Sequence, residues 1–234
     1  MANDWRASHR DIWAVIPVKE TALAKQRLSE ALPRRLCEDL ALAMFQDVLE
    51  AVAAVAELRG VAVVTVDPDV AEIARCWGAE VWSDGARAGH TGAVSAAARR
   101  LAANASTMLT IPGDVPLVSS IDISRVLALH PVAAPAFTIV PAWDERGSNA
   151  IVCSPADVVP LRFGPDSYFP HLAAARAHRL TPTIIHNGAI ALDIDEPSDL
   201  SRFVNKRSAT RSWRLLDACR AEWDRHSSVV FESQ

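Results

Sequence analysis

The sequence feature that most constrains the fold is a regular alternation of short apolar runs with longer segments of helical periodicity. Residues 12–18 (IWAVIPV) form a continuous apolar run, which is typical of a strand buried on both faces of a sheet. Between residues 33 and 55 the apolar side chains instead recur every three or four positions, the period of a helix. Because this succession is repeated along the chain, the sequence predicts an α/β fold with a doubly wound, mainly parallel sheet, in which residues 12–18 form the first, central strand.

The remaining elements follow from the same two patterns. Further strands are predicted at 61–66, 80–82, 107–111 and 183–186, and further helices at 71–77, 92–103, 121–129 and 168–178. Either Ser119 or Ser120 is expected to cap the third of these helices. A last strand pattern at 189–195 (AIALDID) completes the domain.

A β-hairpin is predicted to interrupt the alternation. Residues 136–140 and 149–153 flank a turn at Gly147, and two such runs joined by turn residues are typical of paired antiparallel strands. Residues 1–204 are expected to form one domain and residues 205–234 a polar, basic, helical tail. The tail is expected to dock on the domain or on a partner subunit through an amphipathic stripe: Trp213, Leu216, Cys219, Ala221 and Trp223.

The bulk composition excludes several classes of protein. A net charge of −4 and a pI near 6.0 provide no overall attraction to nucleic acid or to an anionic membrane. No apolar run approaches the roughly 20 residues that a membrane helix needs, and the first residues lack the apolar core of a secretory signal, so a cytoplasmic protein is expected. The four cysteines are far apart in the sequence and are interpreted as small buried apolar side chains.

Asp114 is the first candidate ligand for a metal ion. It directly follows the predicted strand 107–111, in the run GDVPLV, and ligands of open α/β sheets bind beyond the carboxyl ends of the strands. Gly113 is expected to permit close approach of the backbone, and Pro116 to restrict the turn. A helix-capping role for Asp114 is the alternative, but the expected helix start at 119–120 lies several residues later.

Asp193 and Asp195 form a second carboxylate pair at the end of the strand pattern 189–195. Alternation places both on one face of an extended segment, with apolar neighbours on the other face. One of them is expected to bind Mg²⁺ while the other orients a ligand, a loop or a lysine, since Mg²⁺ usually takes only one or two protein carboxylates. Asp195 has an equally good alternative as the cap of a helix that begins near Pro197.

Basic side chains follow the predicted first strand. Lys19, Lys25 and Arg27 lie in the segment PVKETALAKQRLSE, where a first βα loop meets a bound triphosphate. The alternative is a solvated helix face, and no glycine-rich phosphate loop is present. The segment RFGPDSYFPH at 162–171 precedes a predicted helix and is expected to hold an anionic group, although it is also good turn chemistry in its own right.

With these motifs in hand, the sequence resembles the 2-phospho-L-lactate or phosphoenolpyruvate guanylyltransferase family, which acts in coenzyme F(420) biosynthesis. The resemblance covers roughly residues 12–204, and its marks are IPVK with AKQRL, GDVPL, RGSNAIV, RFGPDS with a histidine shortly after, and LDIDEPSDL in this order. It implies the fold of nucleotide-diphospho-sugar transferases and of molybdopterin nucleotidyltransferases. It also implies a nucleotidyltransferase that uses GTP and Mg²⁺.

The resemblance implies roles for individual residues. Mg²⁺ is expected at Asp114 and Asp193, with Asp195 as a further candidate ligand, and the nucleotide phosphates are expected at Lys19, Lys25 and Arg27. Lys19, Lys25 and Asp114 are the candidate catalytic residues. The acceptor's carboxylate and phosphate are expected at Asn149, Gly164 and Ser167. Family members commonly have a Leu-Asn pair where this chain has His90 and Thr91, so Thr91 is the candidate nucleotide contact at a position that departs from the family.

The implied reaction is transfer of GMP from GTP to a small phosphorylated three-carbon acid, with release of pyrophosphate. Phosphoenolpyruvate, 2-phospho-L-lactate and 3-phospho-D-glycerate all fit, and the sequence does not choose among them. A molybdopterin or sugar-phosphate nucleotidyltransferase is one alternative, although the glycine-rich LxGGxGxR loop is missing. A non-catalytic nucleotide-binding paralogue is the other. A homodimer is expected, because the hairpin and the tryptophan-bearing tail offer apolar surface.

Overall fold

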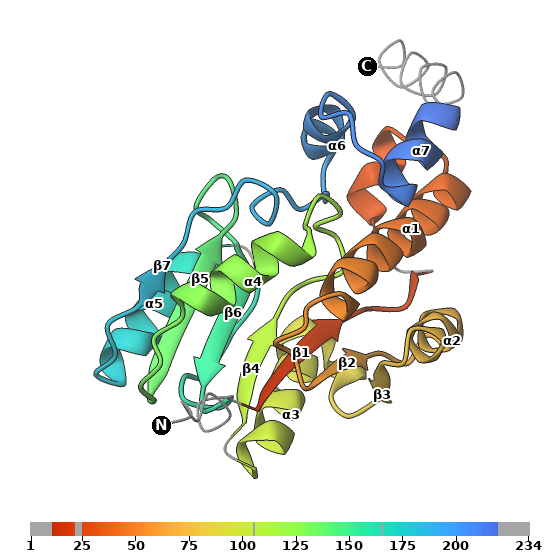
Figure 1. Cartoon of the computed structure of the whole chain (residues 1–234). Helices are drawn as coiled ribbons and strands as arrows, with labels where there is room; N and C mark the ends of the chain where they lie inside the picture. The colour runs from red at the N-terminus through yellow and green to blue at the C-terminus, as the bar shows by residue number, and fades with distance from the viewer. Residues whose placement is uncertain (1–10, 22–24, 105, 165, 220–234) are drawn as a thin grey trace, which may run out of the picture.

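A mixed β-sheet forms the middle layer of the molecule (Figure 1). The computed structural model describes residues 11–21, 25–104, 106–164 and 166–219, and within them the sheet has seven strands in the order β3-β2-β1-β4-β6-β5-β7. The strands are β1 (Ile12–Pro17), β2 (Gly60–Val64), β3 (Glu80–Trp82), β4 (Thr107–Thr110), β5 (Ala136–Pro141), β6 (Ser148–Ser154) and β7 (Thr183–Ile184). All neighbouring pairs are parallel except those of β6, which runs antiparallel to β4 and β5. The predicted α/β class, mainly parallel sheet and inserted hairpin are therefore confirmed.

Helices cover both faces of this sheet (Figure 1). They are α1 (Arg34–Ala53), α2 (Pro68–Cys76), α3 (Gly89–Ala102), α4 (Ser120–Leu129), α5 (Tyr168–Ala177), α6 (Pro197–Val204) and α7 (Arg211–Ala218), with short 3-10 helices η3 (Gln26–Glu30) and η4 (Ala86–Ala88). One hydrophobic core joins the sheet to α1, α2 and α4, and a second core joins the opposite face to α3 and α5. In β1, Ala14 and Ile16 face the first core and Val15 the second, and all three are fully buried. Burial on both faces explains why the first strand is a continuous apolar run.

The helix starts follow their local sequence. Ser119 caps α4, because its hydroxyl accepts from the Asp122 N–H while the Asp122 carboxylate accepts from the Ser119 N–H at 3.0 Å. Asp67 caps α2 in a similar way and also accepts two hydrogen bonds of 2.8 Å from Thr21, in the loop that follows β1. The capping contacts thus secure both the helices and the first βα loop.

The prediction of a last strand at 189–195 is wrong. This segment contains a turn and a bend followed by irregular backbone, and no described strand pairs with it. Its alternation nevertheless holds, because Leu192 and Ile194 are buried in a third hydrophobic cluster with α1, α6 and α7, while Asp193 and Asp195 are more exposed. The expected boundary at residue 204 coincides with the end of α6, and two members of the proposed tail stripe, Ala221 and Trp223, lie outside the described residues.

The four cysteines differ in their burial. Cys37 and Cys153 are buried as predicted and Cys219 is partly buried, but Cys76 is exposed, so the buried interpretation is wrong for that residue. Among the helices that are described, none combines the length and the apolar character needed to cross a membrane.

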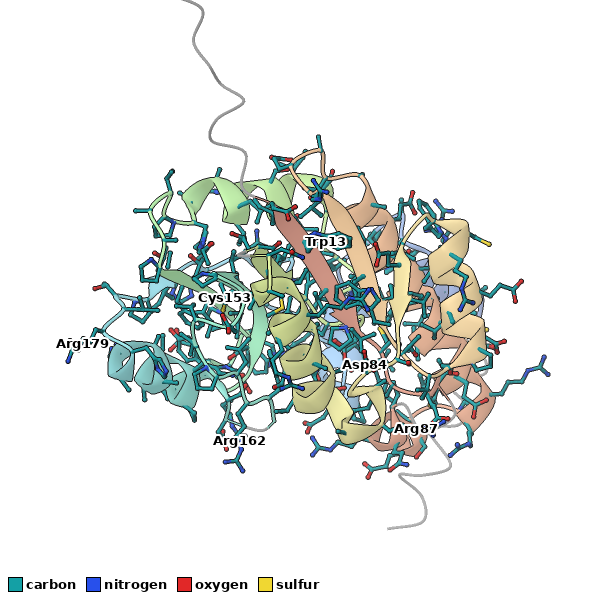
Figure 2. The ribbon with its side chains drawn as sticks, turned by 90° about the horizontal axis from the view of Figure 1, so that it is seen from below. Trp13, Asp84, Arg87, Cys153, Arg162 and Arg179 are labelled. Carbon is teal, nitrogen blue, oxygen red and sulfur yellow. The ribbon has the colours of Figure 1, made fainter. Side chains whose placement is uncertain are left out.

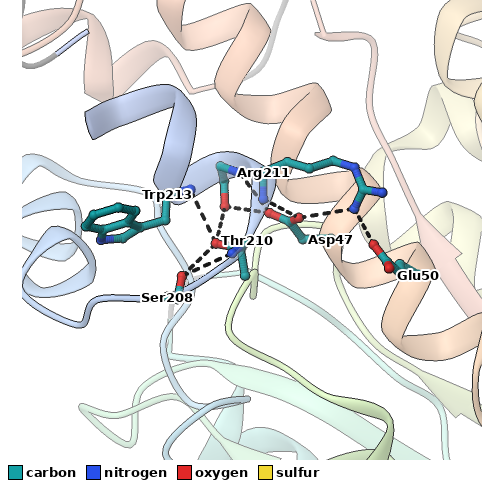
Figure 3. Close-up of polar contacts among 7 residues, drawn as sticks. Asp47, Glu50, Ser208, Thr210, Arg211 and Trp213 are labelled. Atoms are coloured by element: carbon teal, nitrogen blue, oxygen red, sulfur yellow. Dashed lines mark hydrogen bonds and ion pairs between the residues drawn. The ribbon is translucent and has the colours of Figure 1, made fainter. Parts of the chain in front are cut away.

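Asp47 anchors α7 to the middle of α1 (Figure 3). Its two carboxylate oxygens accept hydrogen bonds from the backbone N–H groups of Arg211 and Ser212, at 2.8 and 3.0 Å, and from the Ser212 hydroxyl at 2.6 Å. The Arg211 guanidinium also contacts Glu50 on the same face of α1. Because Asp47 is only 7% exposed, it supplies a buried cap for the first turn of α7.

Asp47→Ala is expected to lower the free energy of unfolding by about 3 kcal/mol and the melting temperature by about 6–12 °C. The loss arises because three donors lose a charged acceptor in a buried position. Thermal and chemical denaturation measure it, with Asp39→Ala as the matched control, since Asp39 is exposed on the same helix. Equal stabilities of the two variants would contradict the anchoring role.

Candidate functional site

A pocket opens where β1 and β4 end, at the carboxyl edge of the parallel strands. Its volume is about 220 Å³. The segment after β1 supplies Lys19, the loop after β4 supplies Asp114, the segment before α6 supplies Asp195, and the first turn of α3 supplies His90. Apolar side chains of α1 complete the wall: Ala41, Met44 and Phe45. The pocket therefore lies where ligands of open α/β sheets bind.

Lys25 joins the two acidic segments of this pocket. Its ammonium donates to Asp114 Oδ2 and to Asp195 Oδ1, both at 2.7 Å, and its side chain is only 6% exposed. Burial alone would lower the pKa of Lys25, but the two carboxylates outweigh it and raise that pKa above its ordinary value. Lys25 is thus a permanent cation at neutral pH. Its backbone is left-handed, with φ of 54°, and it precedes η3 directly.

The two aspartates held by Lys25 do not cap helices. Asp114 lies ahead of the α4 cap at Ser119, and its carbonyl accepts from the Ile194 N–H at 3.1 Å. Glu196, rather than Asp195, caps α6, so the capping alternative for Asp195 is wrong. Although burial raises the pKa of Asp195, the Lys25 ammonium lowers it below its usual value. Orienting a lysine was one of the roles that the sequence left open for Asp193 and Asp195, and in the structure Asp195 contacts Lys25.

Asp193 connects this cluster to the hairpin. The Asn149 side-chain amide donates to Asp193 Oδ1 at 3.0 Å and to the Ile190 carbonyl at 2.9 Å. Burial, followed by the nearby Asp114 carboxylate, raises the pKa of Asp193 to about 7. Asn149 lies near the start of β6, and because β6 is antiparallel its start lies at the same edge as the ends of β1 and β4. Asn149 and Asp193, predicted separately, are therefore in direct contact.

A buried polar network supports the other side of the site. Ser167 is 4% exposed, and its hydroxyl lies 3.4 Å from that of Ser148, the residue before Asn149. Ser148 is also 2.9 Å from His171 Nδ1, while His171 Nε2 accepts from the Arg162 N–H at 2.9 Å. Because Nε2 accepts, Nδ1 carries the proton and donates to Ser148. Burial lowers the pKa of His171 to about 4, so the ring is neutral.

The loop that contains Gly164 is held against the hairpin turn. Arg146 forms an exposed ion pair of 2.6 Å with Asp166, and its carbonyl accepts from the Tyr168 N–H at 2.9 Å. Gly164 has φ of 150°, a conformation that favours glycine, and a Cβ added there would meet nothing within 4 Å. The Arg162 side chain is exposed and points outward (Figure 2), so only its backbone takes part in the network described above.

The remaining candidate residues follow the expected arrangement only in part. Lys19 lines the pocket, but Arg27 pairs with Glu196 at 2.8 Å on the surface, outside the pocket lining. The Thr91 hydroxyl accepts a hydrogen bond from the Phe163 N–H at 2.9 Å and donates one to the Phe163 carbonyl at 3.2 Å. A Cβ at Gly113 would make only ordinary contacts of 3.5 Å or more, so the packing of the chain itself does not demand glycine there.

The acidic residues have the chemistry of a divalent cation site. Among the described residues, no three His, Cys, Asp or Glu side chains are grouped as a ready metal cluster, and Lys25 separates Asp114 from Asp195. However, burial and, after it, the nearby Asp114 carboxylate raise the pKa of Asp193, as expected where two carboxylates lie close together. Two carboxylates, completed by water and substrate phosphates, are a donor set that suits Mg²⁺.

Sequence reasoning missed two features of this site. His171 was noted only as part of a motif, and nothing in its spacing indicated that it would orient Ser148. His90 was noted only as a departure from a family pattern, whereas its side chain forms part of the pocket wall. A short buried histidine network gives no periodic signal, so only the folded geometry shows it.

Comparisons with known proteins agree with the geometry. The family model described as "Guanylyl transferase CofC like" matches residues 12–229. A phosphoenolpyruvate guanylyltransferase of Roseiflexus castenholzii is 33% identical over 208 residues, covering 88% of this chain and 93% of that protein. A 3-phospho-D-glycerate guanylyltransferase of Colwellia psychrerythraea is 34% identical over 188 residues, covering 80% and 88%. A solved structure from Desulfovibrio desulfuricans G20 is assigned as a nucleotide-diphospho-sugar transferase. It matches with a TM-score of 0.69 at 20% identity, and the match covers 93% of this chain and 98% of that protein. This likeness shows the fold.

Proposed function

The chain belongs to the guanylyl transferase CofC-like family of nucleotidyltransferases, and from this premise we propose that it transfers GMP from GTP to a small phosphorylated three-carbon acid. One observation carries the proposal furthest: Asn149 contacts Asp193, so the proposed acceptor side and the acidic side meet at a single point. The relatives are named for phosphoenolpyruvate and for 3-phospho-D-glycerate, which supports an acceptor from the class of three-carbon phospho-acids.

The reaction is an in-line displacement at the α-phosphorus of GTP. An oxygen of the acceptor's phosphate forms the new P–O bond while the bond from the α-phosphorus to the bridging β-oxygen breaks, and its electron pair leaves with pyrophosphate. The attacking phosphate is already ionised near neutral pH, so no general base is required. This agrees with a pocket wall that offers cations and carboxylates rather than a nucleophile.

Different residues of the chain are proposed to bind the triphosphate, the metal ion and the acceptor. Lys19 and Lys25 compensate the charge of the triphosphate, and Lys25 is held in place by its two aspartates. Asp114 and Asp193 would hold Mg²⁺, which when bound supplies positive charge to the phosphate oxygens. On the other side of the site, the acceptor would be bound by Asn149, Gly164 and Ser167. The His171–Ser148 hydrogen bond helps to hold the Ser167 hydroxyl in position.

Pyrophosphate release from GTP with Mg²⁺ tests this function. Phosphoenolpyruvate, 2-phospho-L-lactate and 3-phospho-D-glycerate are supplied one at a time, with a reaction lacking acceptor and one with CTP in place of GTP as controls. Release that requires both GTP and one of the three acids is the expected result, and it identifies the acceptor. Tight binding of GTP without release for any of them would instead favour a non-catalytic nucleotide-binding protein.

A further inference from the structure

His90 lies between the pocket and the loop proposed to bind the acceptor. Its ring lines the pocket together with Lys19 and Lys25, and it stacks on the Phe163 ring with centroids 4.1 Å apart and planes 23° apart. Phe163 immediately precedes Gly164, and its ring also packs edge-on against His171, with centroids 5.1 Å apart. A continuous row of rings therefore connects the pocket wall to the Ser148 network.

Hydrogen bonds fix the Phe163 loop to the first turn of α3. Thr91, the residue after His90, hydrogen-bonds to both the N–H and the carbonyl of Phe163, at 2.9 and 3.2 Å. Backbone and ring of Phe163 are thus both held by the first turn of α3. The pair His90–Thr91 therefore sets where Gly164 lies relative to the pocket, and the His90 ring cannot move far without disturbing that loop.

The polar edge of this ring has no hydrogen-bond partner among the residues that the structure describes. Within that part of the chain, His90 Nε2 is buried and makes no hydrogen bond. Buried polar groups are normally paired, so an unpaired one inside a pocket wall points to a partner that is a ligand. Asp114 and Asp195 line the same pocket and balance the charges of Lys19 and Lys25. Next to His90, however, the first turn of the 14-residue helix α3 carries the positive end of its dipole, which favours an anion.

We propose that His90 is a phosphate-binding residue that donates a hydrogen bond through a ring nitrogen to a substrate phosphate at the junction of nucleotide and acceptor. The inference rests on the proposed guanylyl transfer and names a further contact within that site. The phosphate belongs either to GTP or to the acceptor, and both offer the same acceptor oxygens. A neutral imidazole is sufficient for this role, since one of its nitrogens always carries a proton.

Packing alone is the competing explanation, and the substitutions separate the two. His90→Leu keeps an apolar side chain against Phe163 and removes the donor, whereas His90→Gln keeps a donor and removes the aromatic ring. His186→Leu is the matched control, because His186 is exposed and lies outside the pocket lining. For each variant, kcat and KM are measured for GTP and for the acceptor, with calorimetric binding of GTP alone and the melting temperature.

His90→Leu is expected to lower kcat/KM by about 10- to 100-fold, as for loss of one hydrogen bond to a charged group, with a melting temperature close to that of the wild type. His90→Gln is expected to recover part of this loss, and His186→Leu to behave as wild type. Weaker GTP binding in His90→Leu assigns the contact to the nucleotide, and a raised KM for the acceptor alone assigns it to the acceptor.

The inference is overturned if His90→Leu retains kcat/KM within about twofold for both substrates, or if His90→Gln is as impaired as the leucine variant while the wild type is active. In either case the proposed guanylyl transfer stands, because wild-type activity has been measured in the same assay. Absence of activity in the wild type with all three acids would overturn the proposed function itself, which is a different outcome.

Discussion

Asp114→Asn is expected to lower kcat/KM for guanylyl transfer by about a thousandfold or more, since metal-assisted charge stabilisation contributes several kcal/mol and each 1.36 kcal/mol is a factor of ten. Asparagine preserves the size of the side chain and an oxygen that accepts from Lys25, at present 2.7 Å away. It removes the charge proposed to hold Mg²⁺. Weaker pairing with Lys25 is offset by relief of the repulsion between Asp114 and Asp193, so the melting temperature is expected to change by only about 2 °C.

The control for this variant is Asp157→Asn, an identical exchange at an exposed position. Pyrophosphate release is measured as a function of Mg²⁺ concentration, together with the Mg²⁺-dependent rise in melting temperature in the presence of GTP. Both are expected to persist in the control and to be lost in Asp114→Asn. A variant that keeps a tenth or more of the wild-type rate would contradict a metal-binding role for this carboxylate.

Lys25→Met is expected to remove activity and to destabilise the fold at the same time. The substitution leaves Asp114 and Asp195 facing each other without their shared cation. Breaking a buried pair costs about 3–5 kcal/mol, but Asp195 is 54% exposed, so solvent screening reduces the expected loss to about 2 kcal/mol. Activity is expected to fall by at least about a hundredfold, because a fixed cation near the phosphates is lost.

The pH dependence of this loss has a definite sign. The raised pKa of Lys25 adds stability that is fully present below its unfolded value of 10.5. The lowered pKa of Asp195 adds stability that is present above its unfolded value of 3.8 and is lost as the pH falls through the lower folded value. Urea denaturation is therefore expected to show the full difference from wild type at pH 7 and a smaller one at pH 3.5. Lys25→Arg is the control that keeps the charge, and a difference that grows on acidification would contradict the ion-pair origin.

Hydrophobic periodicity was sufficient to predict most of the sheet and its helices. Burial on two faces leaves a continuous apolar run, as in β1, and the rule that ligands bind at the carboxyl ends of strands pointed to Asp114, which lines the pocket. The same reasoning failed at 189–195, where Leu192 and Ile194 alternate with acidic residues but pack on helices instead of joining the sheet. Alternation reports which side chains are buried, and it does not report whether the backbone has a strand beside it.

The contacts within the site were harder to predict from the sequence. The sequence placed cations and carboxylates in the same region, but the contact of Lys25 with Asp195 depends on a left-handed backbone at residue 25 and on a segment 170 residues away. Neither property has a local signal in the sequence. The same holds for the two histidines. The environment of His90 Nε2 and the tautomer of His171 are set only when α3 and the loop before α5 pack together.

The bridging role of Lys25 also sets an order of events during synthesis. Its two partners follow it by 89 and 170 residues, so a growing chain offers Lys25 only Asp114 until the segment around Asp195 has left the ribosome. Closing so long a loop adds an entropic cost that grows only slowly with length, yet no earlier segment can substitute for the missing carboxylate. The complete Lys25 cluster, which we propose to bind the triphosphate, therefore forms late in synthesis, after the central strands β1, β2 and β4 have been made.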